Sequence, residues 1–428
     1  MQKPSTWSSL LQFIFSLLGS LLLWSAALLL AGLGLAGSLD PALGTGSSLA
    51  LFSMAASLAF IGVLLLPSAV FALDRLMDGP PRQAELLAWL RRLGLSSIIL
   101  LPLILLGGEW AGRNGGNWLL PLLQILAVAL PVSWFFMLAS RGLKLGSAQR
   151  FWGVFATGVF LGPVLALLLE LVALIVILAL GYLALASQPE LLEEITSLLQ
   201  RLTISPPSPA LLQRMLGPYL LNPAAAGAIL AYVAGLVPLL EEAVKPVGLW
   251  LIAGKKLTPA QGFVGGMLSG AGFAIFESLL LATGGEGWTA MLAARVAPGL
   301  MHIATTGTIG YALAASWQGR KYARLGLAYL AVVAVHGLWN GMGVLSAGYE
   351  LLAAGPDDPN PWLQVGRFAP YILMGVALLM ALWLYGFSRM LRRREQETAR
   401  LAAMTPVMIT GEILPAAATQ KTEPERDA

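Results

Sequence analysis

Residues 223–253 read PAAAGAILAYVAGLVPLLEEAVKPVGLWLIA, and the only charged side chains in this stretch are Glu241, Glu242 and Lys245. An α-helix needs about 20 predominantly apolar residues to cross the hydrocarbon core of a bilayer. The stretch is long enough to cross, and its charges lie inside it rather than at its ends. It therefore predicts a transmembrane helix that carries ionisable groups at bilayer depth.

Similar apolar runs recur along most of the chain. Apolar residues make up 57% of the sequence and charged residues only 11%, whereas soluble proteins carry about 25% charged residues. The mean hydropathy is +0.77. We expect an all-α fold: a polytopic integral membrane protein with about ten transmembrane helices. The predicted spans are 9–37, 47–72, 95–108, 117–139, 151–187, 223–253, 259–283, 288–316, 324–346 and 366–388.

Basic residues gather at the termini and in alternate connections between these spans. The positive-inside rule places those connections, and with them both termini, in the cytoplasm. We expect a multi-pass protein of the cytoplasmic (plasma) membrane, with the lipid bilayer as its surroundings. The net charge of +4 does not indicate nucleic-acid binding, because the basic residues lie at span ends. The basic residues of the connections and termini assigned to the cytoplasm are Lys3; Arg75, Arg82, Arg91 and Arg92; Arg141, Lys144 and Arg150; Lys255 and Lys256; Arg320, Lys321 and Arg324; and Arg389 with Arg392 to Arg394.

The spans and their connections divide the chain into five regions. Residues 80–93 are expected to form an amphipathic helix at the cytoplasmic surface. Residues 189–217 have two interpretations, an interfacial helix that gates lateral entry and a packed surface loop. The chain has no cysteine, which excludes disulfides, thiolate metal sites and a cysteine nucleophile. The expected regions are 1–187, five helices; 188–222, an outer-side loop with an amphipathic helix; 223–346, a catalytic four-helix core; 347–389, the last span; and 390–428, a disordered cytoplasmic tail.

Ionisable residues concentrate in the sixth to ninth predicted spans. Each costs about 2.5–3.5 kcal/mol at the centre of a bilayer, so such residues indicate a functional site. Both histidines of the chain fall in these helices. The first five spans hold few ionisable residues, of which Glu170 is the clearest. The set in the later spans is Glu241, Glu242, Lys245, Glu277, Arg295, His302 and His336.

Depth in the membrane indicates that several of these side chains converge. Glu241, Glu277, His302 and His336 lie about 12 to 17 residues from the cytoplasmic ends of their helices. At 1.5 Å per residue, this places all four roughly 18–26 Å from the cytoplasmic boundary. Helices that run in opposite directions therefore bring the four groups to one layer.

Local spacing supports the same site. Lys245 lies one helical turn beyond the two acids of EEAVK and can neutralise one of them. In FAIFE (273–277) and in HGLWN (336–340), the first and last residues share a helix face. Pro238 and Pro246 flank the acidic pair and are expected to loosen that helix. A stripe of small residues lets another helix approach the seventh span closely: Gly262, Gly266, Gly270 and Ala274.

Four motifs carry a resemblance to a known family. They are EEAVK (Glu241 to Lys245), FAIFE (Phe273 to Glu277), His302 within GLMHIATT, and HGLWN (His336 to Asn340). In this order, on consecutive spans, they resemble the PrsW-type intramembrane proteases, within the wider superfamily of CAAX prenyl proteases and bacteriocin-processing or immunity proteins. The resemblance covers about residues 225–345. Glu277 stands where the CAAX branch has a histidine, so prenylated protein substrates are not implied.

The resemblance implies an intramembrane endopeptidase that cuts a membrane-tethered protein, for example an anti-sigma factor. It implies that Glu241 is the general base and that Glu242 forms a supporting ion pair with Lys245. His302 and His336 would orient the water or bind a metal, and Asn340 would donate a hydrogen bond to the oxyanion. Glu277 also belongs to the expected catalytic set, and Phe273 and Arg295 are expected to support it.

Two chemical mechanisms stay open at this point. Glu277, His302 and His336 would suffice to hold zinc with a water in the open position. The same residues also suit a metal-free mechanism in which a glutamate activates water.

Other functions and structural roles also remain. Intramembrane Glu and His residues also mark ion paths, which is compatible with a proton- or ion-coupled transporter. A non-catalytic immunity or scaffold protein could keep the same residues. The acids could instead form structural ion pairs, Glu241 and Glu242 with Lys245 or Arg295, and Glu170 with Arg295.

Overall fold

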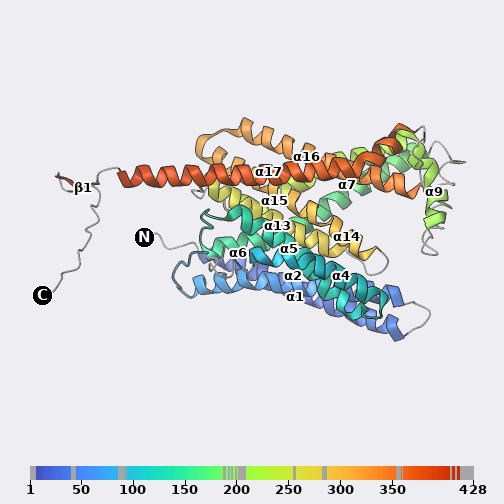
Figure 1. Ribbon diagram of the computed structural model, residues 1–428, viewed down its shortest axis with the longest axis horizontal. Coiled ribbons are helices and arrows are strands. Elements are labelled where there is room, and N and C mark those ends of the chain that lie inside the picture. Colours follow the sequence, from blue (N-terminus) through green and yellow to red (C-terminus); the bar gives the residue numbers. More distant parts are fainter. Residues whose placement is uncertain are drawn as a thin grey trace.

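The computed structural model describes most of the chain as a helical bundle (Figure 1). The described residues are 6–39, 45–84, 92, 94–186, 189–190, 193, 196–197, 200, 209–253, 257–281, 287–352, 358, 360–404, 407–409 and 412–414. The expected helix at 80–93 and the part of the expected segment 189–217 that precedes residue 209 fall largely outside them.

The helices follow the order of the apolar runs in the sequence. The N-terminal part contains α1 (Thr6–Leu39), α2 (Thr45–Leu76), η2 (Ser97–Ile99), α4 (Leu100–Arg113), η3 (Asn117–Leu119), α5 (Leu120–Ser140), α6 (Ala148–Ala156), the π-helical segment η4 (Thr157–Leu161) and α7 (Gly162–Leu185). The C-terminal part contains α9 (Pro209–Leu221), α10 (Pro223–Leu230), the π-helical segment η5 (Ala231–Leu236), α11 (Val237–Val244), α12 (Val247–Trp250), α13 (Pro259–Leu281), α14 (Trp288–Ala294), α15 (Val296–Gly319), α16 (Tyr322–Leu351) and α17 (Pro361–Met404).

Within the described residues, nine helices are long and apolar enough to cross a membrane. This confirms the all-α, polytopic membrane fold. The eighth predicted span, 288–316, differs from the others, because it forms two helices, α14 and α15, separated at Arg295. The helix α15 is not among the nine. It is buried along most of its length, so the bundle rather than lipid surrounds it and tolerates its threonines and glycines.

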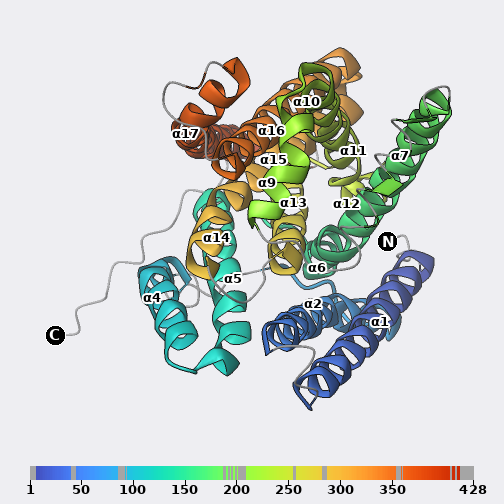
Figure 2. The same cartoon turned by 90° about the vertical axis from the view of Figure 1, so that its right-hand side faces the viewer.

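Helix α13 lies at the centre of the bundle, between the α1–α2 pair and the helices α15 and α16 (Figure 2). In its most apolar window, 78% of the residues are buried, against 39% or less in the other candidate spans. A Cβ atom added at Gly262, Gly266 or Gly270 would collide with backbone carbonyls of α15. The expected stripe of small residues therefore does permit close approach of a neighbouring helix, and that neighbour is α15.

The C-terminal segment is more ordered than the sequence led us to expect. Helix α17 continues to Met404, past residue 389, because its extension LRRREQETARLAAM consists mostly of strong helix formers. Two short antiparallel strands follow, β1 (Val407–Ile409) and β2 (Glu412–Leu414). Helix α1 begins on the side of the bundle from which the extension of α17 projects (Figure 1).

The close packing of α13 on α15 yields a first prediction. Replacing Gly266 by alanine places a methyl group against the Thr306 carbonyl and should destabilise the protein by about 1–3 kcal/mol, as overpacking does. Gly326→Ala is the matched control, because a Cβ atom there meets open space. Thermal unfolding in detergent micelles should show a lower Tm for the first variant only; equal Tm values would contradict the packing.

Candidate active site

The EEAVK motif lies on a helix that is interrupted on both sides. The π-helical segment η5 precedes α11, whose first turn contains Pro238. Helix α11 ends at Val244, and α12 begins after Pro246, which has no N–H to donate to the preceding turn. The prolines thus loosen this helix as expected. Such irregular turns are frequent at functional sites, because they redirect side chains and free backbone groups.

One half of the site is an ionic cluster around the fully buried Lys245. Its ammonium nitrogen Nζ lies 2.7 Å from Glu242 Oε1 and 2.9 Å from Glu241 Oε2, over the face of Phe273. His336 Nδ1 lies 2.9 Å from the same Glu242 oxygen, and the Thr305 hydroxyl donates to it at 3.4 Å. The expected Glu242–Lys245 ion pair is therefore present and joins α11 to α15 and α16.

The other half of the site is a chain of contacts that begins at Arg295. The Arg295 guanidinium donates to Glu277 Oε1 at 2.7 Å and to the Ser278 hydroxyl at 3.2 Å. The second oxygen of Glu277 lies 2.7 Å from His302 Nε2. Arg295 thus pairs with Glu277, not with Glu170 as one of the structural alternatives held. The break between α14 and α15 places Arg295 where it can reach α13.

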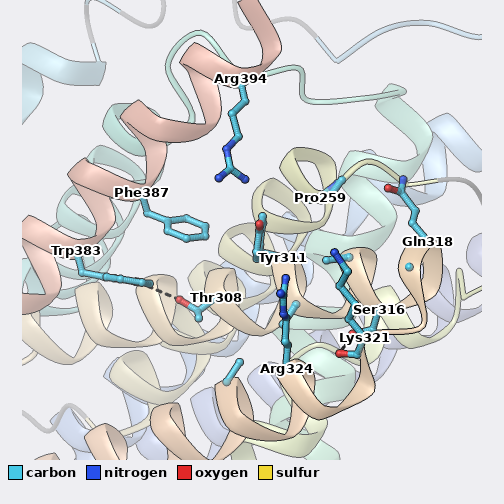
Figure 3. A pocket seen from close by; sticks show the side chains of 14 residues that line it. Pro259, Thr308, Tyr311, Ser316, Gln318, Lys321, Arg324, Trp383, Phe387 and Arg394 are labelled. Carbon is cyan, nitrogen blue, oxygen red and sulfur yellow. Dashed lines mark hydrogen bonds between the residues drawn. The ribbon is translucent and has the colours of Figure 1, made fainter. Parts of the chain in front are cut away.

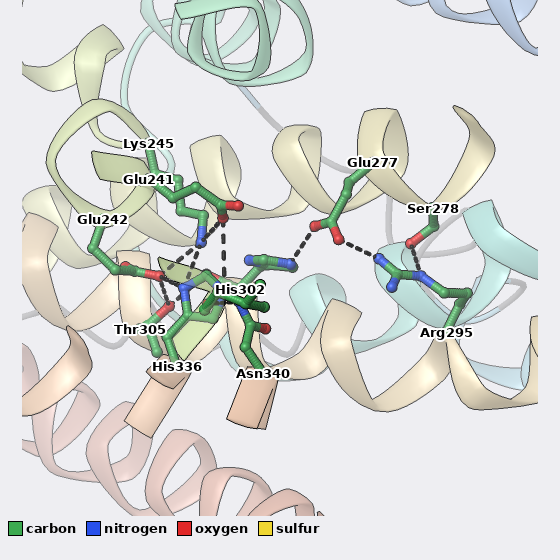
Figure 4. A network of polar contacts seen from close by, with 11 residues as sticks. Glu241, Glu242, Lys245, Glu277, Ser278, Arg295, His302, Thr305, His336 and Asn340 are labelled. Atoms are coloured by element: carbon green, nitrogen blue, oxygen red, sulfur yellow. Dashed lines mark hydrogen bonds and ion pairs between the residues drawn. The ribbon is translucent and has the colours of Figure 1, made fainter. Parts of the chain in front are cut away.

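The two halves meet at Glu241 (Figure 4). One ligand atom each from Glu241, Glu277 and His302 all lie within 4.8 Å of one another. The Glu241 carboxylate also lies 3.8 Å from His336 Nε2, and the two imidazole rings are 5.5 Å apart, edge to face. The convergence that the depth argument predicted is therefore seen in four side chains from four helices.

Asn340 lies at the edge of this group. Its amide nitrogen donates to the carbonyl oxygen of Val233 at 3.1 Å, in the π-helical segment η5. One amide hydrogen therefore helps to fix η5 against α16, and the second is available to another acceptor.

Two contacts of the site were not foreseen from the sequence. Glu170 on α7 lies beside Glu241, and the Ser269 hydroxyl donates to the Lys245 carbonyl. No spacing rule links residues on separate helices, so no sequence signal pointed to either contact. Thr305 could have been found, because it follows His302 by three residues and shares its helix face.

The charges and donors of the site fit a divalent cation. Three carboxylates, Glu241, Glu242 and Glu277, face two cations, Lys245 and Arg295, and Glu170 lies beside Glu241, so the acids of the site outnumber its cations when the histidines are neutral. His302 Nδ1 is buried without a hydrogen-bond partner among the described atoms. Carboxylate oxygen and imidazole nitrogen are ligands that zinc accepts.

The three residues whose ligand atoms lie within 4.8 Å of one another differ in one member from the predicted metal set of Glu277, His302 and His336. Glu241 takes the place of His336 in it. The Nδ1 atom of His336 is engaged with Glu242 and lies near Lys245.

Comparison with known proteins identifies the family of this chain. The model of a protein family described as PrsW family intramembrane metalloprotease matches residues 147–382, more than half of the chain. The chain belongs to the PrsW family. It is thus an intramembrane protease and a multi-pass membrane protein. The match to the PrsW family begins before the predicted 225–345 and includes α6 and α7. No curated protein and no solved structure matches the chain.

The buried ammonium of Lys245 generates the second prediction. Lys245→Met leaves two buried carboxylates without their cation and should lower stability by about 3–5 kcal/mol, the usual cost of removing one partner of a buried pair. Lys144→Met removes an exposed lysine and should leave the Tm within error of the wild type. The measurement is thermal unfolding of both variants in the same detergent; a wild-type Tm for Lys245→Met would refute the structural role.

Proposed function

We propose that this PrsW-family protein hydrolyses a peptide bond of a membrane-tethered protein with a water molecule that Glu241 activates. The observation that carries the proposal is the position of the Glu241 carboxylate. It lies within 4.8 Å of ligand atoms of Glu277 and His302 and 3.8 Å from His336 Nε2. A water held there has a base on one side and imidazole groups on the other.

The carboxylates around the histidines support this role through the tautomers they select. A carboxylate only accepts hydrogen bonds, so Glu277 favours the tautomer of His302 with the proton on Nε2, 2.7 Å away. The lone pair of His302 Nδ1 then faces the site. By the same argument Glu242 favours the proton of His336 on Nδ1, so Nε2 accepts. A water that donates one hydrogen to His336 Nε2 and one to Glu241 would bridge their 3.8 Å separation.

The remaining polar groups complete the proposed mechanism. Glu241 takes a proton from the water as it attacks the peptide carbonyl and returns that proton to the leaving amine. The second amide hydrogen of Asn340 stabilises the oxyanion, as side-chain amides do in other proteases. The Lys245 ammonium, 2.9 Å from Glu241 Oε2, holds the Glu241 carboxylate in place. Phe273 covers the Lys245 ammonium and contacts the His302 ring, with ring centroids 5.4 Å apart.

The same atoms suit a metal ion. Glu241, Glu277 and His302 would hold a zinc-type cation, which in such sites polarises the carbonyl and lowers the pKa of a bound water. Arg295 and Ser278 then hold Glu277 in the orientation that the ion requires, as outer-shell partners of metal ligands do.

The fractions of these side chains that the bundle leaves uncovered favour one side as the route to the site. The Lys245 and Glu242 side chains are fully buried, whereas Glu241 is 12% exposed, Arg295 18% and Glu277 29%. Arg295 begins α15 at the end of the bundle opposite to the connection between α15 and α16. The proposed substrate therefore reaches Glu241 past Glu277, from the end with few basic residues.

Removing the proposed base gives the third prediction. Glu241→Gln keeps the shape of the side chain and should lower cleavage by roughly 10²- to 10⁴-fold, the usual contribution of general acid–base catalysis. Mass spectrometry of the host membrane fraction would compare new protein termini at equal abundance of each form. Glu350→Gln, on an exposed part of α16, is the control and should cut like the wild type. Undiminished new termini with Glu241→Gln would remove Glu241 from the role of base.

Metal content of the purified protein provides the fourth prediction. We expect about one divalent cation per chain, as in mononuclear zinc hydrolases. Inductively coupled plasma mass spectrometry after gel filtration measures this metal content. His302→Ala should lose this ion, whereas His336→Ala should keep most of it, because His336 is not among the residues whose ligand atoms lie within 4.8 Å of one another. Equal loss in both variants would favour the set Glu277, His302 and His336. Active wild-type protein with only background metal would favour the metal-free glutamate mechanism.

A further inference from the structure

A cavity of about 480 Å³ opens far from Glu241, where α15 ends and α16 begins, against one side of α17. Figure 3 shows its lining side chains converging from these three helices. None of the catalytic candidates lines it. It lies at the end of the bundle from which the extension of α17 leaves, the end that the positive-inside rule assigns to the cytoplasm.

The mouth of the cavity is cationic. Lys321, Arg324 and Arg394 line it, and none of its described lining residues is acidic. All three side chains are exposed, and no ion pair joins any of them to an acid within the described part of the chain. Three cations that face one cavity without an anion favour a negatively charged occupant.

The inner wall of the cavity is aromatic and held in place by its own contacts. Trp383 stacks on Phe387 with ring centroids 5.1 Å apart, and Tyr311 meets Phe387 edge to face at 4.9 Å. The Trp383 indole N–H donates to the Thr308 hydroxyl at 3.0 Å. Trp383 nevertheless keeps 44% of its surface exposed. This wall therefore offers a fixed apolar surface rather than a set of hydrogen-bonding groups.

Helix geometry indicates how far the cavity extends along the bundle. Thr308 lies eleven residues before Gly319, the end of α15, which corresponds to roughly 17 Å at 1.5 Å per residue. On α17, Trp383 and Arg394 are separated by the same number of residues. Two helices thus agree that the cavity runs from a cationic mouth at the surface to an aromatic wall at hydrocarbon depth.

We propose that this cavity binds an anionic glycerophospholipid, with the phosphate at the three cations and the glycerol and upper acyl chains along the aromatic wall. Basic pockets between transmembrane helices on the cytoplasmic side suit acidic lipid headgroups. A free phosphate ion would use the cations but not the aromatic wall. The flank of a protein substrate is the poorer match, because membrane segments carry basic residues on that side.

The lipid would join the three helices that its cavity separates. Of these, α15 carries His302 and α16 carries His336. A bound lipid would therefore restrict the movement of both helices at their cytoplasmic ends, and with it the positions of the two histidines. The binding site itself does not depend on the proposed chemistry, and its test uses binding and thermal stability instead of cleavage.

The test compares three forms of the full-length protein in neutral detergent, each titrated with phosphatidylglycerol or phosphatidylcholine. The cavity variant is Lys321→Gln with Arg324→Gln and Arg394→Gln. The control is Arg389→Gln with Arg393→Gln and Arg400→Gln, which removes the same charge from exposed positions of α17 outside the cavity. Native mass spectrometry measures lipid binding, and thermal unfolding measures the accompanying rise in Tm.

We expect the wild type and the control to bind phosphatidylglycerol roughly 10- to 100-fold more tightly than phosphatidylcholine, since each nearby cation favours an anionic lipid. The cavity variant should lose this preference and its rise in Tm. If the triple variant fails to fold, the single variant Arg394→Gln, on the exposed extension of α17, replaces it. This variant should weaken the preference for phosphatidylglycerol several-fold.

Three results would overturn the proposal. Equal losses in the control and the cavity variant would show a general charge effect. Equal binding of both lipids by the wild type would show no headgroup site. An equal rise in Tm with millimolar inorganic phosphate, and no gain from the lipid, would show a free-anion site.

Discussion

Two carboxylates on adjacent residues, Glu241 and Glu242, share one buried ammonium group, that of Lys245. An unpaired charge in a dry interior costs several kcal/mol, so both acids can stay within the bundle only because the ammonium lies between them. The same contact also fixes the position of His336 on α16, since Glu242 Oε1 contacts its Nδ1 atom. One cation therefore holds the proposed base and one of the two histidines at fixed positions.

The second half of the site depends on how closely two helices approach. Glu277 on α13 and His302 on α15 come within 2.7 Å of each other, which requires the helix backbones to be nearly in contact. Glycines allow this, because a Cβ atom at Gly270 would collide with the carbonyl of His302 itself. A membrane offers no hydrophobic force between apolar helices, so such close packing supplies much of their association.

The sequence was sufficient to predict the elements and the layer in which they meet, but not the partners within that layer. Hydropathy located nine spans correctly, because helices that face lipid must be apolar. It described α14 and α15 less well, because protein rather than lipid surrounds α15. Depth along each helix is fixed by counting residues, which is why Glu241, Glu277, His302 and His336 could be grouped.

Rotation about each helix axis and the tilt of neighbouring helices are set by packing, and no count of residues contains them. The sequence therefore did not distinguish Glu277 from Glu170 as the partner of Arg295. For the same reason the sequence placed His336 rather than Glu241 in the candidate metal set, whereas the ligand atoms that lie closest together belong to Glu241, Glu277 and His302. The helical extension of α17 was missed for a different reason: its charges favoured disorder, although its residues are strong helix formers.

The two halves of the site differ in their access to water, and this difference bears on their roles. Around Lys245 the ammonium group contacts both carboxylates and is itself fully buried, so these electrostatic interactions are strong in a medium of low dielectric constant. The Glu277 side chain is 29% exposed, and His302 Nδ1 has no hydrogen-bond partner among the described atoms.

A hydrolase needs both environments, since its base must be held in place while water and a peptide enter beside it. Glu241 stands at the boundary, bound to the covered cluster through one oxygen and open toward Glu277. A single residue that is both anchored and accessible is the requirement for general-base catalysis inside a membrane. That requirement singles out Glu241 over Glu242, whose side chain is anchored in the same way but has no exposed surface.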